Sequence, residues 1–433
     1  MTAGEEANRS DVIIVGGGAA GLATAAQLGR RGVPCRVLER GTEIGGSWSG
    51  RYERLRLNTI RQLSRMPGLP IARPAGRWVA REDFVSYLHA YRAHHCIHVE
   101  FETAVETIDR AGHGWQLKTS AGTMVAPQVV VATGFDRVPR VPAWPGIDSF
   151  DAPVLHSAQY RNAEPYRDQD VLVVGAGSSG TEIALDLAEG GARVAIAIRT
   201  PPLLLAREWG GIPVSVFSLL GRLSVRRVRD VSAGLLSRAM FGDLSAYGID
   251  RCKQQLSEMI ERGRLPTVDT GFVQAVREGR ITVAAALERF ERSAVVLADG
   301  SRLSPDCVVA ATAFQGGLEP MLGHLGVVGE NGRPRLQGGP WNDAAPSLYF
   351  VGYRTALTGH LAPIRTDARR ASRAIARERG RMATAGRRAT RAGPRRSERS
   401  LAPVGKRDLD AGLTQNGDAS ADERRRPEAG VTR

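Results

Sequence analysis

The sequence predicts an α/β protein with two Rossmann-like dinucleotide-binding domains, the second inserted into the first. Two observations predict this fold. The apolar segment 11–15 runs into a glycine-rich turn at 16–21, and the apolar segment 170–174 runs into a second such turn at 175–180. Each turn has the pattern G-x-G-x-x-G and is followed by a helical stretch and a further strand. A dinucleotide-binding turn requires this context, so the chain is expected to hold two dinucleotides at once.

The first turn supplies the candidate residues Gly16, Gly17, Gly18, Ala20 and Gly21. In this pattern the first glycine permits the tight turn and the second lets a pyrophosphate approach the backbone. The third lets the helix pack closely on the strand. The pyrophosphate is expected at the helix N-terminus, where free N–H groups and the helix dipole favour anions.

The second turn supplies the candidate residues Gly175, Gly177, Ser178, Ser179 and Gly180. The same division of roles among its three glycines is expected. The helical stretch after this turn extends to about residue 190, and the next strand is expected over 193–199.

The residue that closes the second strand of each unit distinguishes the two ligands. In the first unit it is Glu39, followed by Arg40, and a carboxylate suits a ribose 2′-hydroxyl, as in FAD or NAD. In the second unit it is Arg199, followed by Thr200, which suits the additional 2′-phosphate of NADP. The alternative is that Arg199 is an exposed cationic side chain without a ligand, because the chain is rich in arginine.

Length and composition agree with a globular α/β enzyme. The chain has 433 residues, 42% of them hydrophobic, and 50 glycines. Its four cysteines form no C-x-x-C pair, so neither a zinc ribbon nor a dithiol redox pair is expected, and a reducing cytoplasm is favoured. No metal-ligand constellation and no transmembrane segment is expected, since no apolar run approaches the roughly 20 residues that span a bilayer.

The net charge of +14 is concentrated at one end. From residue 377 onward the chain has 15 Lys or Arg against 8 Asp or Glu, so this segment carries half of the net charge. It has few large apolar residues and is expected to be a disordered, solvated tail. The alternative is a weak electrostatic contact with an acidic polymer or membrane surface. The remaining charge is scattered, so nucleic-acid binding is not expected.

Two similar runs of strands follow the two glycine-rich units. The first comprises 99–105, 115–119 and 123–131 and ends in Ala132-Thr133-Gly134. The second comprises 281–283, 294–297 and 306–312 and ends in Ala311-Thr312-Ala313. The region 201–265 differs, with apolar segments before an amphipathic helix expected over 223–241. We expect this region either to pack on the core, to form a wall of a substrate tunnel or to lie on a membrane surface.

In this order the motifs resemble those of the flavin-dependent monooxygenases that include the flavin-containing monooxygenases and the plant YUCCA enzymes. The resemblance covers residues 12 to about 376. Besides the two turns and the two strand ends, it rests on Gly45-Gly46-Ser47-Trp48 and on Tyr52-Glu-Arg-Leu-Arg-Leu-Asn58. The segment 150–160 is similar to the family's F-x-G-x-x-x-H-x-x-x-Y/F signature, with Ala152 replacing its glycine. Tyr160 at the end of this segment argues against the Baeyer–Villiger branch.

The resemblance implies an NADPH- and FAD-dependent monooxygenase that inserts one oxygen atom from O2 into a small organic substrate through a flavin hydroperoxide. N- or S-oxygenation and YUCCA-like oxidative decarboxylation of a 2-oxo acid both stay open. Asn58 is the implied catalytic residue, with a turn-forming asparagine as the alternative; His156 is either a catalytic acid or a linker histidine bonded to backbone. Further cofactor contacts are expected at Gly46, Ser47, Trp48, Val105, Ala132, Thr133, Gly134, Thr312 and Gly352.

The expected domain organisation follows from the same motifs. An N-terminus at 1–10 and the Arg-rich tail at 377–433 are expected to be disordered. The FAD-binding domain is expected at 11–160 and 306–376, and the NADPH-binding domain at 161–305 with an apolar or amphipathic insertion at about 201–265.

Two rival functions are weighed against the monooxygenase. One is an NAD(P)H:acceptor flavoprotein reductase, similar to ferredoxin reductases and without oxygen transfer; its disulfide version requires a cysteine pair facing the flavin, which this sequence does not offer. The other is a non-catalytic tethering protein that uses the basic tail. The sequence leaves the oligomeric state open, a homodimer included.

Overall fold

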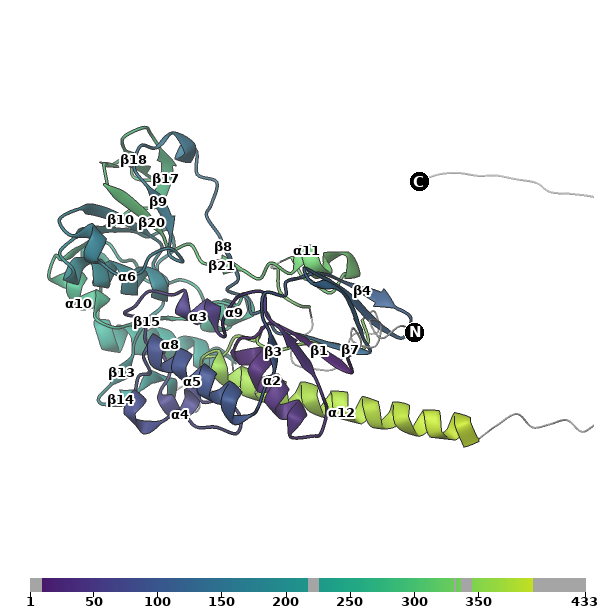
Figure 1. The fold of residues 1–433 in the computed structure, drawn as a ribbon. Coiled ribbons are helices and arrows are strands. Elements are labelled where there is room, and N and C mark those ends of the chain that lie inside the picture. Colours follow the sequence, from purple (N-terminus) through teal and green to yellow (C-terminus); the bar gives the residue numbers. More distant parts are fainter. Residues whose placement is uncertain (1–9, 217–225, 331, 336–344, 392–433) are drawn as a thin grey trace, which may run out of the picture. The chain divides into compact units, whose positions relative to one another are not determined.

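The computed structural model describes residues 10–216, 226–330, 332–335 and 345–391. Residues Met1–Met382 form one compact unit, which contains both parallel sheets (Figure 1). Nearly all of the expected N-terminal segment and residues 392–433 of the expected tail lie outside the described residues.

The first sheet has five parallel strands in the order β22-β7-β1-β2-β3. Their bounds are Leu348–Phe350 for β22, Gln128–Val131 for β7, Val12–Val15 for β1, Arg36–Leu38 for β2 and Val99–Glu100 for β3. Because neighbouring strands run in the same direction, their carboxyl ends meet along one edge. In such sheets a ligand binds outside the carboxyl ends, where the strand order reverses. Here the order reverses at β1, between β7 and β2.

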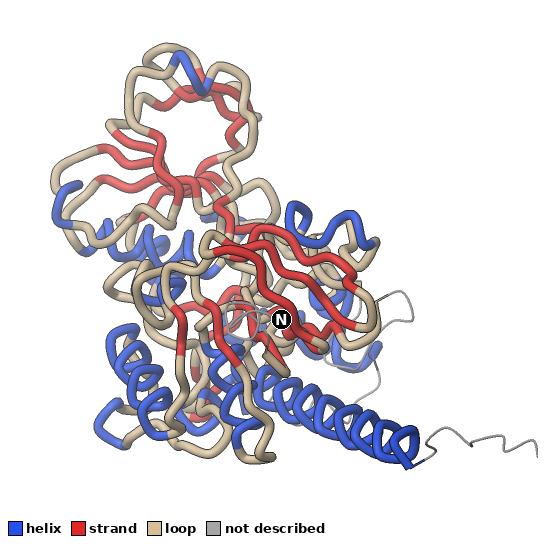
Figure 2. Tube along the Cα trace, turned by 45° about the vertical axis from the view of Figure 1, so that its right-hand side comes forward, coloured by secondary structure: helices blue, strands red, loops and turns tan. Residues whose placement is uncertain are grey.

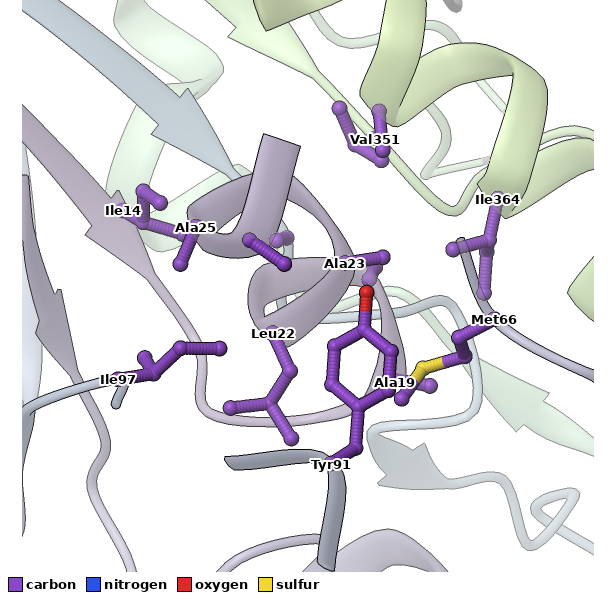
Figure 3. Packing of buried hydrophobic residues seen from close by; sticks show 14 of the residues in the cluster. Ile14, Ala19, Leu22, Ala23, Ala25, Met66, Tyr91, Ile97, Val351 and Ile364 are labelled. Atoms are coloured by element: carbon purple, nitrogen blue, oxygen red, sulfur yellow. The ribbon is translucent and has the colours of Figure 1, made fainter. Parts of the chain in front are cut away.

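Alternation along β1 explains the layers on the two faces of this sheet. Val12 and Ile14 point to a core formed with the helices α2 (Ala19–Gly29), α5 (Arg81–His94) and α12 (Leu361–Arg391). Figure 3 shows Ile14 in this core with Leu22 of α2, Tyr91 of α5 and Ile364 of α12.

The opposite face of the first sheet is covered by an antiparallel three-stranded sheet. Its strands are β4 (Val105–Ala111), β5 (Gly114–Thr119) and β6 (Gly122–Ala126). Ile13 and Val15 of β1 pack against this layer. The single strand expected over 99–105 is in fact the end of β3 and the start of β4, because the chain turns between them at Glu102, whose φ is +53°.

The second sheet repeats this plan with five parallel strands in the order β16-β11-β10-β20-β9. Their bounds are Ile281–Ala284 for β16, Arg193–Ala197 for β11, Asp170–Val174 for β10, Cys307–Ala310 for β20 and Val154–His156 for β9. On one face Val171 and Val173 pack under α6 (Ser178–Glu189) and α10 (Phe272–Arg277). On the other, Leu172 and Val174 pack under β17 (Leu287–Phe290), β18 (Val295–Leu297) and β19 (Arg302–Leu303).

The second sheet includes strands from both sides of the domain boundaries expected from the sequence. β9 lies within 11–160 and β20 lies within 306–376, yet both pair in this sheet. β20 pairs with β10 through Val171↔Cys307 and β9 pairs with β20 through Val308↔Val154. The connections between the two halves therefore precede β9 and follow β20, which moves the expected boundaries at 160 and 306 to about 153 and 311.

The region 201–265 contains short elements beside the second sheet. They are β12 (Leu204–Ala206), β13 (Glu208–Trp209), β14 (Ile212–Pro213), α8 (Arg226–Phe241) and α9 (Leu256–Glu261), and β12 pairs in parallel with β15 (Thr267–Asp269). The helix expected over 223–241 is present as α8, but besides burying Ala233 and Phe241 it leaves the apolar side chains of Val228, Val231 and Leu235 exposed. Residues 217–225, the first part of the expected insertion helix among them, lie outside the described residues.

Smaller elements complete the described chain. They are α3 (Gly46–Ser49), α4 (Arg61–Ser64), η1 (Arg73–Ala75), β8 (Val138–Pro139), η2 (Ile147–Ser149), η3 (Glu164–Tyr166), η5 (Ser245–Tyr247), β21 (Phe314–Gln315), α11 (Glu319–Leu322) and η6 (Gly323–Leu325). None of the helices in the described ranges combines the length and the apolar character needed to cross a membrane.

The last helix corrects the expected start of the tail. α12, the long terminal helix in Figure 2, continues past residue 377 to Arg391. Glu378 ties it to the first sheet, because its carboxylate accepts hydrogen bonds from Gln128 Nε2 at 2.8 Å, from the Tyr349 hydroxyl at 2.7 Å and from the Ser347 hydroxyl. A disordered tail from 377 is therefore wrong for residues 377–391, whose alanines and arginines are strong helix formers.

Candidate dinucleotide and active sites

The first glycine-rich turn lies at the carboxyl edge of the first sheet, between β1 and α2. Gly16 has φ +109°, and a Cβ there would lie 2.8 Å from the Ala132 carbonyl oxygen. A Cβ on Gly21 would lie only 1.9 Å from the Gly16 carbonyl oxygen. The first and third glycines are thus required by the protein's own backbone, as the pattern predicted.

Gly18 is different, because a Cβ there would meet no atom within 4 Å. Nothing in the chain itself requires glycine at this position, which begins α2 as its N-cap. The room in front of it suits a group from outside the chain, and the helix N-terminus behind it favours an anion. This geometry fits the pyrophosphate of FAD.

Glu39 follows β2 directly and faces the same turn. Its Oε2 accepts a hydrogen bond from the Gly17 N–H at 2.6 Å, and its Oε1 accepts one from the Gly41 N–H at 2.9 Å. Two backbone donors fix the carboxylate beside the turn, and a carboxylate retains further lone pairs for a ribose hydroxyl. Arg40, the next residue, is exposed.

The ends of two other strands complete this edge. Ala132 is buried just after β7, and the Thr133 hydroxyl lies 2.7 Å from the Tyr353 hydroxyl. Gly352 follows β22 with φ +93°, where a Cβ would lie 2.8 Å from the Cβ of Ala20. The structure therefore brings these residues together with Gly16. Gly134, two residues past Ala132, has φ +74°.

Four further candidates lie on neighbouring elements. Gly46, Ser47 and Trp48 form the short helix α3; the first two are exposed, and the half-buried Trp48 packs edge-on against Phe84 with ring centroids 4.6 Å apart. Part of the indole thus belongs to the core, and part stays accessible. Val105 is buried at the start of β4.

The second glycine-rich turn has the same construction. Gly175 has φ +111°, and a Cβ on Gly180 would lie 1.8 Å from the Gly175 carbonyl oxygen. Gly177, the N-cap of α6, would again place a Cβ in open space. Ser178 and Ser179 begin α6. This turn therefore fits a second pyrophosphate for the same physical reasons.

Arg199 and Thr200 lie just beyond the carboxyl end of β11, and both are exposed. In the described part of the chain no acidic partner is recorded for Arg199, so its guanidinium is available to an added phosphate. Thr312, after β20, donates a hydrogen bond to the Arg140 carbonyl. The next residue, Ala313, adopts φ +67°, the left-handed conformation that the corresponding Gly134 adopts in the first sheet.

His156 is bonded to backbone on both ring nitrogens. Its Nδ1 accepts a hydrogen bond from the Ala158 N–H at 3.1 Å, which leaves Nε2 to donate to the Ala313 carbonyl at 3.0 Å. Burial lowers the pKa of this imidazole, so the neutral ring is favoured. The structure thus matches the linker histidine rather than the catalytic acid.

Asn58, the candidate catalytic residue, is half-buried and belongs to a polar cluster that the sequence did not indicate. Its Oδ1 accepts a hydrogen bond from Arg207 Nη2 at 3.1 Å. Next to it the Tyr52 hydroxyl donates to Glu182 Oε2 at 2.7 Å. Tyr52 stood in the motif that includes Asn58, whereas Glu182 and Arg207 are far from it in sequence, and no short-range signal links the three segments.

Comparisons with known proteins agree with this geometry. Residues 13–207 match the family described as pyridine nucleotide-disulphide oxidoreductase. The chain is 33% identical over 322 residues to indole-3-pyruvate monooxygenase YUCCA1 of Oryza sativa subsp. japonica, covering 72% of this chain and 79% of that protein. It is 34% identical over 370 residues to indole-3-pyruvate monooxygenase YUCCA4 of the same plant, covering 80% and 84%.

A solved structure shows the same fold. The flavin-containing monooxygenase from Stenotrophomonas maltophilia superposes with a TM-score of 0.67 at 23% identity, over 86% of this chain and 99% of that one. The resemblance of the two-sheet architecture therefore extends over nearly the whole of that protein.

Proposed function

We propose a substrate class and residue roles from the premise that this chain belongs to the flavin-dependent monooxygenases that include the plant indole-3-pyruvate monooxygenases. It is an FAD- and NADPH-dependent monooxygenase, and the rival reductase is not favoured, because the similar plant enzymes are monooxygenases. The four cysteines are unpaired, and the disulfide version of the reductase lacks its cysteine pair.

The proposed reaction is the oxidative decarboxylation of a 2-oxo acid that carries an apolar or aromatic group. The observation that carries it is the similarity to two plant enzymes named for indole-3-pyruvate, a 2-oxo acid, over about four fifths of their length. The reaction consumes the 2-oxo acid, O2, NADPH and a proton. It yields the acid shortened by one carbon, CO2, water and NADP⁺. When bound, the two cofactors supply the reducing equivalents and the activation of oxygen.

The residues at the carboxyl edges of the two sheets are proposed to hold the cofactors. The turn at Gly16, Gly18 and Gly21 would hold the FAD pyrophosphate, and Glu39 its ribose. The turn that ends at Gly180 would hold NADPH, with Arg199 and Thr200 on the 2′-phosphate. The support is the open space before each second glycine and the exposed cation after β11.

Asn58 is proposed as the catalytic residue, with an amide N–H that would donate a hydrogen bond toward the bound flavin. Asn58→Ala should leave flavin reduction by NADPH intact but divert oxygen to hydrogen peroxide. The amount of product per NADPH is the measurement; if it is unchanged, Asn58 does not have this role.

The reaction class is tested with indole-3-pyruvate and phenylpyruvate under ¹⁸O2. One CO2 for each NADPH consumed and one ¹⁸O atom in the shortened acid are expected. Hydrogen peroxide as the sole product with both 2-oxo acids, together with an oxygenated amine or sulfide from matched probes, would contradict decarboxylation and favour N- or S-oxygenation.

We also propose a cytoplasmic location, since unpaired cysteines persist in a reducing compartment. A homodimer and a weak contact between the basic tail and an acidic surface remain proposals from the sequence. Size-exclusion chromatography at several protein concentrations tests the first, and sedimentation with anionic vesicles tests the second.

A further inference from the structure

A buried polar cluster joins three distant segments around Asn58. Tyr52 and Asn58 come from the loop before α4, Glu182 from the second turn of α6, and Arg207 from the residue after β12. Tyr52 bonds Glu182 at 2.7 Å, and Arg207 bonds Asn58 at 3.1 Å. The guanidinium of Arg207 also lies over the ring of Trp78, 5.2 Å from its centroid.

The carboxylate of this cluster is deeply buried, whereas its cation, Arg207, is half-buried. Glu182 is 4% exposed and Tyr52 is 3% exposed. Burial raises the pKa of Glu182, while the Tyr52 hydroxyl, the Arg207 guanidinium and the Asn58 amide oppose that rise. Burial likewise lowers the pKa of Arg207, and the Glu182 carboxylate opposes it. Each charge therefore depends on the other, because an uncompensated buried charge is costly.

The hydrogen bonds of the cluster are incomplete. Glu182 Oε1 and Arg207 Nε are both buried without a hydrogen-bond partner in the described chain. A cluster that served stability alone would be replaced at little cost by apolar side chains. The cluster is therefore weak evidence for a stabilising role, and its contact with Asn58 indicates a different one.

The position of Asn58 supplies that role. Arg207 holds its carbonyl end through the hydrogen bond to Oδ1, and the buried Glu182 carboxylate favours the charged form of the Arg207 guanidinium. An unrestrained asparagine amide can rotate and exchange its donor and acceptor ends. With Oδ1 held by a cation, the amide cannot exchange its two ends, so its NH2 group keeps a single direction.

We propose that Glu182 and Arg207 are positioning residues that fix the amide of Asn58 for its role beside the flavin. This inference rests on the proposed role of Asn58. Because Glu182 follows Ser178 by one helical turn in α6, the same helix carries both the second dinucleotide turn and the residue that orients Asn58.

The test compares Glu182→Gln and Arg207→Met with Asn58→Ala. In both positioning variants the fraction of NADPH-derived electrons that ends in hydrogen peroxide should rise several-fold, toward that of Asn58→Ala. In the double variant Asn58→Ala/Arg207→Met the fraction should equal that of Asn58→Ala alone, because Arg207 acts through Asn58. Arg207→Lys, which keeps the charge but not the planar donor, should fall between wild type and Arg207→Met.

Asp186→Asn is the matched control. Asp186 lies one turn further along α6 and accepts a hydrogen bond from the Tyr160 hydroxyl at 2.7 Å, so it is a tyrosine-bonded carboxylate like Glu182 but bonds to a different tyrosine. Its peroxide fraction should stay at the wild-type value. An increase equal to that of Glu182→Gln would show a general effect of α6 and overturn the proposal.

A second readout does not depend on turnover. Glu182→Gln and Arg207→Met should each lower the unfolding temperature of the holoenzyme, and the double variant should unfold no lower than the worse single variant, because neither charge is then left alone. Additive losses would overturn the mutual dependence. If Asn58→Ala itself gives the wild-type peroxide fraction, the proposed role of Asn58 fails. If Asn58→Ala raises that fraction but Glu182→Gln and Arg207→Met do not, the positioning inference alone fails.

Discussion

The two alanines that replace family glycines should respond in opposite directions to mutation back to glycine. Ala313 has φ +67°, whereas Ala152 is not among the residues with positive φ. A left-handed conformation costs a non-glycine residue roughly 1–2 kcal/mol. Glycine in place of alanine, in turn, lowers the free energy of unfolding by about 0.4–1 kcal/mol, because it increases the entropy of the unfolded chain.

The net effect follows from these two quantities. Ala313 is exposed, so removal of its methyl group loses little packing. Ala313→Gly should therefore stabilise the protein by about 0.5–1 kcal/mol, the difference between strain relieved and entropy lost. Ala152→Gly relieves no strain and should destabilise it by about 0.4–1 kcal/mol.

Urea unfolding with saturating FAD, followed by tryptophan emission, measures both variants. With a denaturant dependence of about 3 kcal/mol per molar, the midpoints of the two variants should lie roughly 0.3–0.7 M apart, with that of Ala313→Gly above the wild-type value. A lower midpoint for Ala313→Gly, or a shift of both variants in the same direction, would refute the strain at Ala313.

Three further outcomes are expected. Gly18→Ala should fold normally but purify without yellow colour, whereas Gly21→Ala should fail to fold, because only the Cβ added at position 21 would meet the backbone. Flavin absorbance and circular dichroism separate the two outcomes. Bound FAD in Gly18→Ala would contradict the first-site assignment. Arg199→Ala should weaken NADPH binding by about 2 kcal/mol, roughly 30-fold, and leave NADH unaffected; equal losses for both coenzymes would remove the 2′-phosphate contact. A chain ending at Met382 should keep its flavin content and NADPH oxidation. A chain ending at 377 lacks the hydrogen bonds of Glu378, so its free energy of unfolding should fall by about 2 kcal/mol or more. Equal melting temperatures for the two truncated chains would contradict the role of that carboxylate.

Much of the architecture could be predicted from the sequence because it depends on local patterns. The strand–turn–helix units at Gly16 and Gly175 combine a short apolar strand with glycines that the backbone itself requires. The requirement at Gly21 and at Gly180 acts within six residues, because each Cβ would meet the carbonyl of the first glycine in the same turn, so it is visible in sequence. The carboxylate of Glu39 beside the first turn was predictable from its place at the end of the second strand of the unit.

What could not be predicted depends on pairing between distant segments. The membership of β9 and β20 in the second sheet is decided by register across about 150 residues, not by their own composition. The extension of α12 depends on Glu378, which bonds residues far away in sequence. The cluster around Asn58 was missed because its bonds join residues 130 and 149 positions apart in the sequence, from Tyr52 to Glu182 and from Asn58 to Arg207.

Helix α6 carries Ser178, Glu182 and Asp186 at intervals of four, so the three side chains follow one another along a single stripe. Insertion or deletion of one residue near its start would rotate that stripe by about 100°. The coenzyme turn, the contact to Tyr52 and the contact to Tyr160 would then lose alignment together. Length variation among homologues should consequently be absent from this helix and confined to the loops that flank it.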